Sequence, residues 1–213
     1  TGRTTAFGIA TTAGLAFGAG SAGTVQLNGN NMTLIGLNTH ATVGTPIVEN
    51  GAAGNVALTC NTAANSAFGG VLQDGAGGGT LGLAKLGTGK LTLSGANEHT
   101  GVTIVSNGIL SVSSLANGGL PSNLGKSPAA ESNLLLSGGT LQYTSTGAVV
   151  DRGFTVSGAS TFDLSAAGAT LTMGPVSIGA FTLNVTGNAV TPGVLSLGAV
   201  TQSGNATFNP TTA

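Results

Sequence analysis

The chain has 213 residues, of which 5% are charged and 38 are glycine, and its formal net charge is −1. So little charge provides no electrostatic field to attract nucleic acid, anionic lipid or charged substrates. Gly, Ser, Thr or Asn interrupts every apolar stretch, which excludes a membrane-spanning helix, and 40% hydrophobic residues argue against disorder.

Short stretches along the chain alternate apolar residues with hydroxyl or amide residues. Alternation with a period of two places apolar side chains on one face of a strand and polar side chains on the other. In chain order, strands are predicted at Val25–Leu27, Leu91–Leu93, Val102–Ile104, Leu110–Val112, Leu141–Tyr143, Phe154–Val156, Phe162–Leu164, Leu171–Met173, Phe181–Val185 and Leu195–Leu197. The chain is therefore predicted to be all-β.

Turn-forming residues separate these stretches. Glycine and asparagine tolerate positive φ, which suits them to sharp changes of chain direction. They occur at Asn28-Gly29, Glu49-Asn50-Gly51, Asp74-Gly75, Asn107-Gly108, Ser137-Gly138-Gly139 and Gly187-Asn188. No helix is predicted, because the best candidate, residues 115–124, contains Asn117-Gly118-Gly119.

The spacing of the strands suits two architectures. Strand centres recur about every 8 to 13 residues, as in a β-solenoid or an antiparallel β-sandwich. Aromatic residues make up 4% of the chain and Trp is absent, which favours a narrow solenoid with a core of Leu, Val, Ile and Ala. With two strands to a coil of about 20 residues, about ten coils would form a rod about 50 Å long. We expect residues 1–213 to form one solenoid domain.

One segment resembles a known bacterial repeat. Residues 78–112 read GGTLGLAKLGTGKLTLSGANEHTGVTIVSNGILSV. They resemble the passenger-associated transport repeat of autotransporters, a family of bacterial surface proteins. The matching positions are Lys85, Gly87, Gly89, Leu91, Leu93, Gly95, Asn97, Thr100, Gly101, Gly108 and Leu110. Glu98-His99 departs from the usual Thr-Tyr pair, which puts a stacked aromatic ring at that corner in doubt.

The resemblance extends over about residues 66–160. Phe68–Gly75 is similar to the coil that often precedes the repeat, and Asn133–Val156 is similar to coils of very long surface proteins. The resemblance implies a right-handed parallel β-helix that is exported and displayed or released outside the cell.

Residues suited to catalysis are scattered. The carboxylates are Glu49, Asp74, Glu98, Glu131, Asp151 and Asp163. β-Helix enzymes that act on polysaccharides need an acid/base pair beside a cation. Glu131 and Asp151, about one coil apart and next to Arg152, are the best-spaced pair. The alternative, which we favour, is that Asp151 and Arg152 form a solvated corner or a local ion pair, and no catalytic residue is predicted.

Metal and phosphate sites are also not predicted. A metal site needs converging ligands, and His40, Cys60 and His99 are far apart in sequence. Cys60 is the single cysteine and is expected to be a buried apolar residue. Gly89-Lys90-Leu91 lacks the Ser or Thr and the helix of a phosphate-binding loop. We therefore expect no cofactor.

Both terminal segments lack charge, from Thr4 to Val48 and from Leu164 to Ala213. Open solenoid ends expose unpaired backbone groups, so two explanations apply. The chain, which begins at Thr1 rather than Met, is a piece of a longer stack, or its ends pair with copies of itself.

The sequence therefore predicts an extracellular, structural or adhesive β-solenoid without catalysis. Its expected partners are copies of itself or surface glycans and proteins of a host or neighbouring cell. The alternatives are a head-to-tail filament subunit and a polysaccharide-active enzyme.

Overall fold

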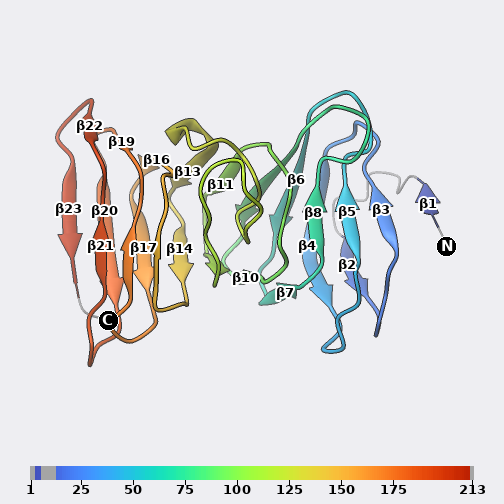
Figure 1. Cartoon of the computed structure of the whole chain (residues 1–213), viewed down its shortest axis with the longest axis horizontal. Helices are drawn as coiled ribbons and strands as arrows, with labels where there is room; N and C mark the ends of the chain where they lie inside the picture. Colours follow the sequence, from blue (N-terminus) through green and yellow to red (C-terminus); the bar gives the residue numbers. More distant parts are fainter. Residues whose placement is uncertain (1–2, 6–12, 212–213) are drawn as a thin grey trace.

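The computed structural model describes residues 3–5 and 13–211, which form a rod of stacked parallel strands (Figure 1). All pairings between the strands described are parallel. The nine-stranded sheet along the rod corresponds to about nine coils, close to the ten expected. The β-solenoid prediction is confirmed, and the alternative of an antiparallel sandwich is wrong.

The first face is a nine-stranded sheet that runs the length of the rod. Its strands are β2 (Ala13–Phe17), β4 (Met32–Thr39), β6 (Val56–Asn61), β9 (Leu81–Leu86), β11 (Thr103–Val105), β13 (Leu134–Ser137), β16 (Phe154–Gly158), β19 (Val176–Ile178) and β22 (Val200–Gln202).

The second face is a seven-stranded sheet. Its strands are β7 (Ser66–Phe68), β10 (Lys90–Leu93), β12 (Ile109–Val112), β14 (Thr140–Tyr143), β17 (Ser160–Leu164), β20 (Thr182–Gly187) and β23 (Thr207–Pro210).

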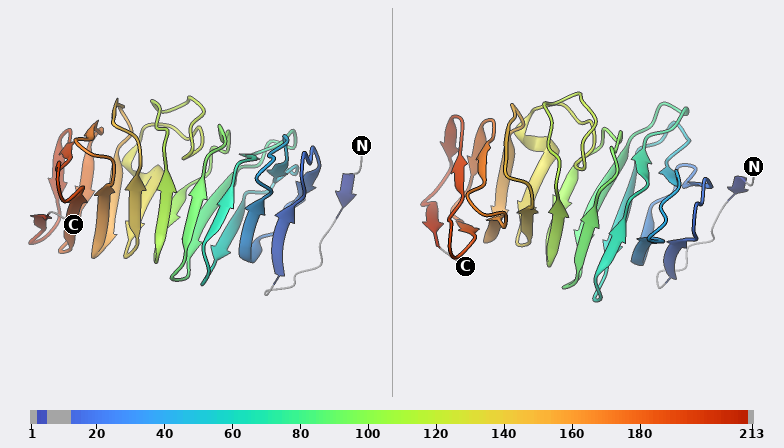
Figure 2. Two further views of the ribbon diagram at one scale, coloured as in Figure 1. Left: turned by 90° about the horizontal axis from the view of Figure 1, so that it is seen from below. Right: turned by 60° about the horizontal axis from the view of Figure 1, so that its bottom comes forward.

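The third face consists of two shorter sheets. The N-terminal sheet contains β1 (Arg3–Thr5), β3 (Thr24–Gln26), β5 (Ile47–Glu49) and β8 (Val71–Gln73), and the C-terminal sheet contains β15 (Gly147–Val149), β18 (Thr170–Thr172) and β21 (Val194–Ser196). Both β8 and β15 follow a strand of the second face and precede a strand of the first face, so the two sheets occupy the same side of the coil. Figure 2 shows the successive strands lying side by side along the rod.

The structure agrees with the predicted strands and with the prediction that residues 115–124 form no helix. Each of the ten predicted stretches overlaps a strand, and residues 115–124 contain no helix. In the described part of the chain the one helix is a 3-10 turn, η1 (Glu131–Asn133). None of the helices described has the length and apolar character that a membrane crossing requires.

Apolar side chains fill the rod from coil to coil. Leu58, Leu83, Leu110 and Leu141 are among many leucines that are at most 1% exposed. Isoleucine and alanine contribute less to this core than the sequence suggested, and phenylalanine contributes more. Phe17 packs on Phe68, with ring centroids 5.8 Å apart. Phe154 and Phe162 of one coil pack in the same way at 5.7 Å, so aromatic rings fill the bore where Leu and Val do not.

Asparagines at the corners join adjacent coils. The side-chain oxygens of Asn31, Asn55 and Asn65 accept hydrogen bonds from backbone N–H groups of the next coil, at 2.9, 2.9 and 3.0 Å. Among the non-glycine residues described, positive φ occurs at Asn28 alone. Tolerance of positive φ therefore explains the corner glycines, such as Gly29 at 78°, whereas most corner asparagines are needed for their hydrogen bonds.

Candidate functional site

The third face is interrupted where the chain makes a longer coil. Leu83 pairs with Thr103, and Thr103 pairs with Leu134, so the second of these coils contains extra residues. The extra chain, residues 113–130 between β12 and η1, is called the insert below (yellow-green in Figure 2). Two coils separate β8 from β15 on this face, and the insert belongs to the second of them, after the coil that carries Glu98 and His99.

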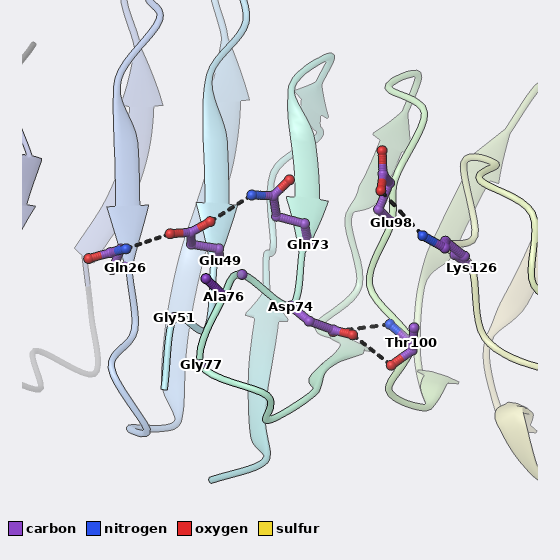
Figure 3. Close-up of a pocket in the computed structure, with 11 residues that line it drawn as sticks. Gln26, Glu49, Gly51, Gln73, Asp74, Ala76, Gly77, Glu98, Thr100 and Lys126 are labelled. Atoms are coloured by element: carbon purple, nitrogen blue, oxygen red, sulfur yellow. Dashed lines mark hydrogen bonds and ion pairs between the residues drawn. The ribbon is translucent and has the colours of Figure 1, made fainter. Parts of the chain in front are cut away.

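A groove of about 770 Å³ lies beside the insert on the third face (Figure 3). Its lining residues are Gln26, Glu49, Gly51, Gln73, Asp74, Gly75, Ala76, Gly77, Glu98, Thr100 and Lys126. They come from five successive coils, and no aromatic or large aliphatic side chain is among them. The groove therefore offers polar contacts to whatever approaches it.

A ladder of amide and carboxylate groups forms one wall of the groove. Gln26, Glu49 and Gln73 occupy the same register position on β3, β5 and β8. The Nε2 atoms of Gln26 and Gln73 donate to the two carboxylate oxygens of Glu49, the second at 2.6 Å. The carbonyl oxygens of the two glutamines take no part in these two bonds, so they remain as acceptors along the groove.

Asp74 fixes the next corner of the groove. Its Oδ1 accepts from the N–H groups of Leu81 at 2.7 Å and Thr100 at 3.1 Å, and its Oδ2 accepts from the Thr100 hydroxyl at 2.6 Å. These bonds cross from one coil to the next. Asp74 is therefore a structural carboxylate that sets the position of Thr100.

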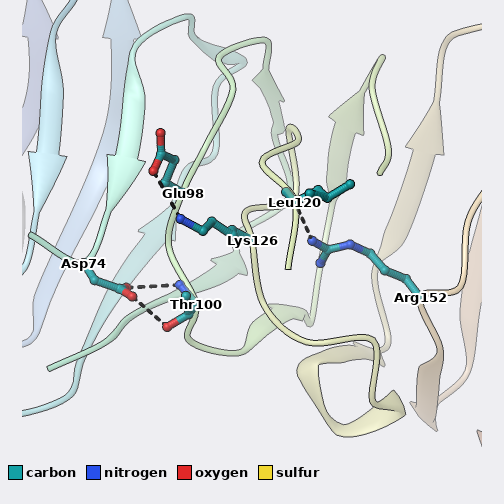
Figure 4. A network of polar contacts seen from close by, with 6 residues as sticks. All are labelled: Asp74, Glu98, Thr100, Leu120, Lys126 and Arg152. Atoms are coloured by element: carbon teal, nitrogen blue, oxygen red, sulfur yellow. Dashed lines mark hydrogen bonds and ion pairs between the residues drawn. The ribbon is translucent and has the colours of Figure 1, made fainter. Parts of the chain in front are cut away.

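Glu98 and Lys126 close the groove on the side of the insert (Figure 4). Lys126 Nζ lies 3.5 Å from Glu98 Oε2, and the two side chains are 40% and 49% exposed. An exposed pair of this kind contributes little to stability, about 0 to 1 kcal/mol. The pair matters because of where it lies: Lys126, the one cation among the residues that line the groove, belongs to the insert.

His99 lies behind Glu98, inside the coil. Its side chain is completely buried, with Nε2 3.3 Å from the Thr103 hydroxyl and Nδ1 without a hydrogen-bond partner. Burial lowers the pKa of the imidazole to about 4; Asp74 acts against this shift and Arg152 adds to it. His99 is therefore neutral at pH 7, and it fills the corner where the repeat usually carries Tyr.

Arg152 also points inward, toward the insert. It is 3% exposed, and its guanidinium donates to the backbone oxygens of Ala116 at 2.9 Å and Gly125 at 2.7 Å. It also reaches the Ser127 hydroxyl at 3.0 Å and the Leu120 carbonyl at 3.4 Å (Figure 4). A solvated corner is thus the wrong description of Arg152.

Asp151 and Glu131 do not form a pair with Arg152. Asp151 Oδ1 accepts from the N–H of Gly118 at 2.7 Å, and its own N–H donates to the side chain of Asn117 at 3.0 Å. In the described part of the chain no ion pair joins Asp151 to Arg152. The side chains of Asp151 and Arg152 are therefore each engaged in holding the insert.

The candidate metal ligands remain apart. His40 is exposed and accepts from the N–H of Thr42, Cys60 is buried on the first face, and His99 is buried beneath the third. Among the residues that the structure describes, no three His, Cys, Asp or Glu side chains converge. Lys90 begins strand β10 rather than a helix.

The sequence reasoning missed the groove because it singled out Glu131 and Asp151. Glu49, Asp74 and Glu98 lie about one coil apart, and this spacing was the available signal. The spacing is not sufficient by itself, because the insert changes the coil length and so changes which later residues stack.

The repeat identified from the sequence has an unexpected buried lysine. The Lys85 side chain is completely buried, and Nζ donates to the carbonyls of Leu86 at 2.6 Å, Gly87 at 2.8 Å and Asn107 at 3.2 Å. Gly87, at φ 71°, makes this turn possible. Lys85 thus joins the turns of two successive coils.

Comparison with known proteins assigns this segment. Residues 83–112 match the passenger-associated-transport-repeat family. The chain carries a passenger-associated transport repeat. The repeat spans β10, β11, β12 and most of β9, together with Lys85 and His99. The resemblance to autotransporter passengers is confirmed.

A curated relative supports the same assignment. The chain is 44% identical over 98 residues to the adhesin BmaC autotransporter of Brucella suis biovar 1 (strain 1330). The similar region covers 41% of this chain and 3% of the adhesin, so the chain spans a small part of that relative. No solved structure matches the chain significantly.

Proposed function

We propose that the chain is a segment of an extracellular autotransporter passenger that contributes to adhesion without catalysis. The observation that carries this proposal is the 44% identity to a protein named as an adhesin, over a region of 98 residues. The fold is consistent with it, because stacked coils give a rod whose sides meet other surfaces.

The groove on the third face is the proposed contact surface. It combines the partly buried polar groups of the Gln26–Glu49–Gln73 ladder with the exposed Glu98–Lys126 pair. The partner is a glycan or protein on another cell or matrix.

The test displays the chain on a non-adherent bacterium, fused to a translocator barrel, and counts bacteria retained on animal cells and on matrix proteins. We expect more retained bacteria than with the barrel alone. Glu98→Ala combined with Lys126→Ala should reduce retention, whereas Thr170→Ala, on the exposed part of β18, should not. Retention equal to that of the barrel alone rejects the proposal.

A second candidate is end-to-end association with copies of the chain. Strands β22 and β23 each pair on one side only, and all their residues are exposed, including Val200 at 41% and Phe208 at 36%. Unpaired strand edges without charge favour the addition of another strand. Sedimentation at rising concentration should then show oligomers that Phe208→Glu with Val200→Lys abolishes, and a monomer at all concentrations contradicts this candidate.

A further inference from the structure

The insert is hydrogen-bonded to the rod on two sides, to residues 95–99 of the preceding coil and to residues 151–153 of the following coil. The N–H of Asn97 donates to the Ser122 carbonyl at 2.9 Å, and the N–H of Lys126 donates to the His99 carbonyl at 2.8 Å. The Asn97 side chain also donates to the Asn123 carbonyl at 2.8 Å. Residues 97–99 therefore hold the insert on this side, and Lys126 is positioned directly by His99.

Arg152 supplies the second attachment. Four of its contacts reach the insert, at Ala116, Leu120, Gly125 and Ser127, and none of these partners carries a negative charge. A buried guanidinium held only by neutral oxygens contributes a positive potential around it. Arg152 is a positioning residue for the insert rather than a ligand-binding residue.

His99 and Gly125 are in close contact between these attachments. A Cβ on Gly125, which has φ of 80°, would lie 2.6 Å from His99 Cε1 and 2.7 Å from Nε2. The imidazole is therefore covered by the insert. Nδ1 has no hydrogen-bond partner, and the groups that favour a second proton on the ring, Asp74 and the backbone of Leu72, are outweighed by burial.

We propose that the insert is an acid-sensitive cover at this end of the groove, and that protonation of His99 releases residues 113–130, and Lys126 with them, from the third face. The proposal rests on the proposed function only in treating the groove as a contact surface. It adds a regulation of that surface by pH.

The charges around His99 determine the direction of the response. Asp74 favours the protonated ring, while Arg152 and burial disfavour it, with burial the largest effect. Glu98 and Lys126 form an exposed pair outside the coil and are screened by solvent. A protonated His99 would share a buried corner with Arg152, and lifting the insert removes this conflict by admitting water.

The size of the response follows from linkage. The covered ring has a pKa of about 4, and a ring exposed by opening returns to 6.5. Opening is therefore favoured about 30-fold more at pH 5 than at pH 7.5, since the open form binds the extra proton. Release also removes Lys126 from Glu98 and leaves the groove more acidic in charge.

Hydrogen exchange measured by mass spectrometry tests the acid-induced release of the insert, and it requires no ligand. Protection factors, which correct for the intrinsic effect of pH on exchange, are compared at pH 7.5 and pH 5 for peptides of the insert and of β14 and β17. We expect about 30-fold lower protection in the insert at pH 5 and unchanged protection in the two strands. Equal loss in all three peptides means global unfolding and overturns the proposal, as does no loss in the insert.

Two variants complete the test. His99→Gln preserves a donor near Thr103 but cannot be protonated, so the insert should lose its pH response; a persisting response overturns the proposal. His40→Gln, at the exposed histidine, should leave the response intact. Because exchange is read on the purified chain, a negative adhesion assay would not affect the outcome.

Discussion

Lys85 lies directly next to Cys60 on the adjacent coil, and both side chains are completely buried. Burial lowers the pKa of the lysine and raises the pKa of the cysteine to about 12, while each group moderates the shift of the other. A neutral thiol therefore lies beside an amine that is held by three backbone carbonyls. This arrangement places a polar anchor within the otherwise apolar core of the repeat.

Replacing Lys85 with methionine should destabilise the rod. Lys85→Met keeps a long apolar stem but leaves the carbonyls of Leu86, Gly87 and Asn107 without their donor. The expected loss is about 2 to 3 kcal/mol in the free energy of unfolding, measured by denaturant titration. The matched control is Lys90→Met on β10, which should change stability by less than about 0.5 kcal/mol. Equal effects of the two variants would show that Lys85 does not anchor the turns.

Cys60 should be unreactive in the folded chain. Its pKa of about 12 leaves almost no thiolate at pH 8, and the side chain is inaccessible. Labelling with a thiol reagent at pH 8 should be at least about 100-fold slower than for a free thiol. In concentrated guanidinium chloride the same thiol should react fully. Rapid labelling of the native chain would contradict the burial of this strand.

Gly95 should tolerate no side chain. A Cβ there would lie 1.8 Å from the carbonyl oxygen of Gly70 on the preceding coil, so the coils would have to separate. Gly95→Ala should cost about 2 to 3 kcal/mol, measured by thermal and denaturant unfolding. Gly54→Ala is the control, because nothing lies within 4 Å of a Cβ at that position. If both variants lose the same free energy of unfolding, the coils do not approach each other closely at Gly95.

His99 should make stability depend on pH. Its pKa is about 4 in the folded chain and 6.5 when unfolded, so the unfolded state binds more protons between these values. Stability should therefore fall as the pH decreases from about 6.5 to about 4, by up to about 3 kcal/mol. The free energy of unfolding is measured for the native chain and for His99→Gln at pH 7.5 and at pH 4.5. The difference between the two proteins at each pH separates the contribution of His99 from that of the carboxylates. A difference that does not vary with pH would contradict it.

The strands and corners of each coil could be predicted from the amino-acid sequence. The alternation at Leu91–Leu93 and Phe162–Leu164 gave strands where they were predicted, because side chains that alternate along a strand must face the core and solvent in turn. Glycines such as Gly29 and Gly51 marked the corners, since positive φ is favourable for glycine. The repeat pattern around Lys85 and Gly95 identified the autotransporter resemblance. These are local properties, and local properties can be read from neighbouring residues.

The contacts between side chains of different coils depend on how the coils stack and could not be predicted from the sequence. Coil length varies, and the insert lengthens one coil, so spacing in sequence does not reveal that Glu49, Asp74 and Glu98 share a groove. Nor does it reveal that Arg152 turns inward to carbonyls of the insert instead of pairing with Asp151. A charged side chain is buried when stacking supplies enough hydrogen-bond acceptors to replace water, and those acceptors belong to residues distant in the sequence.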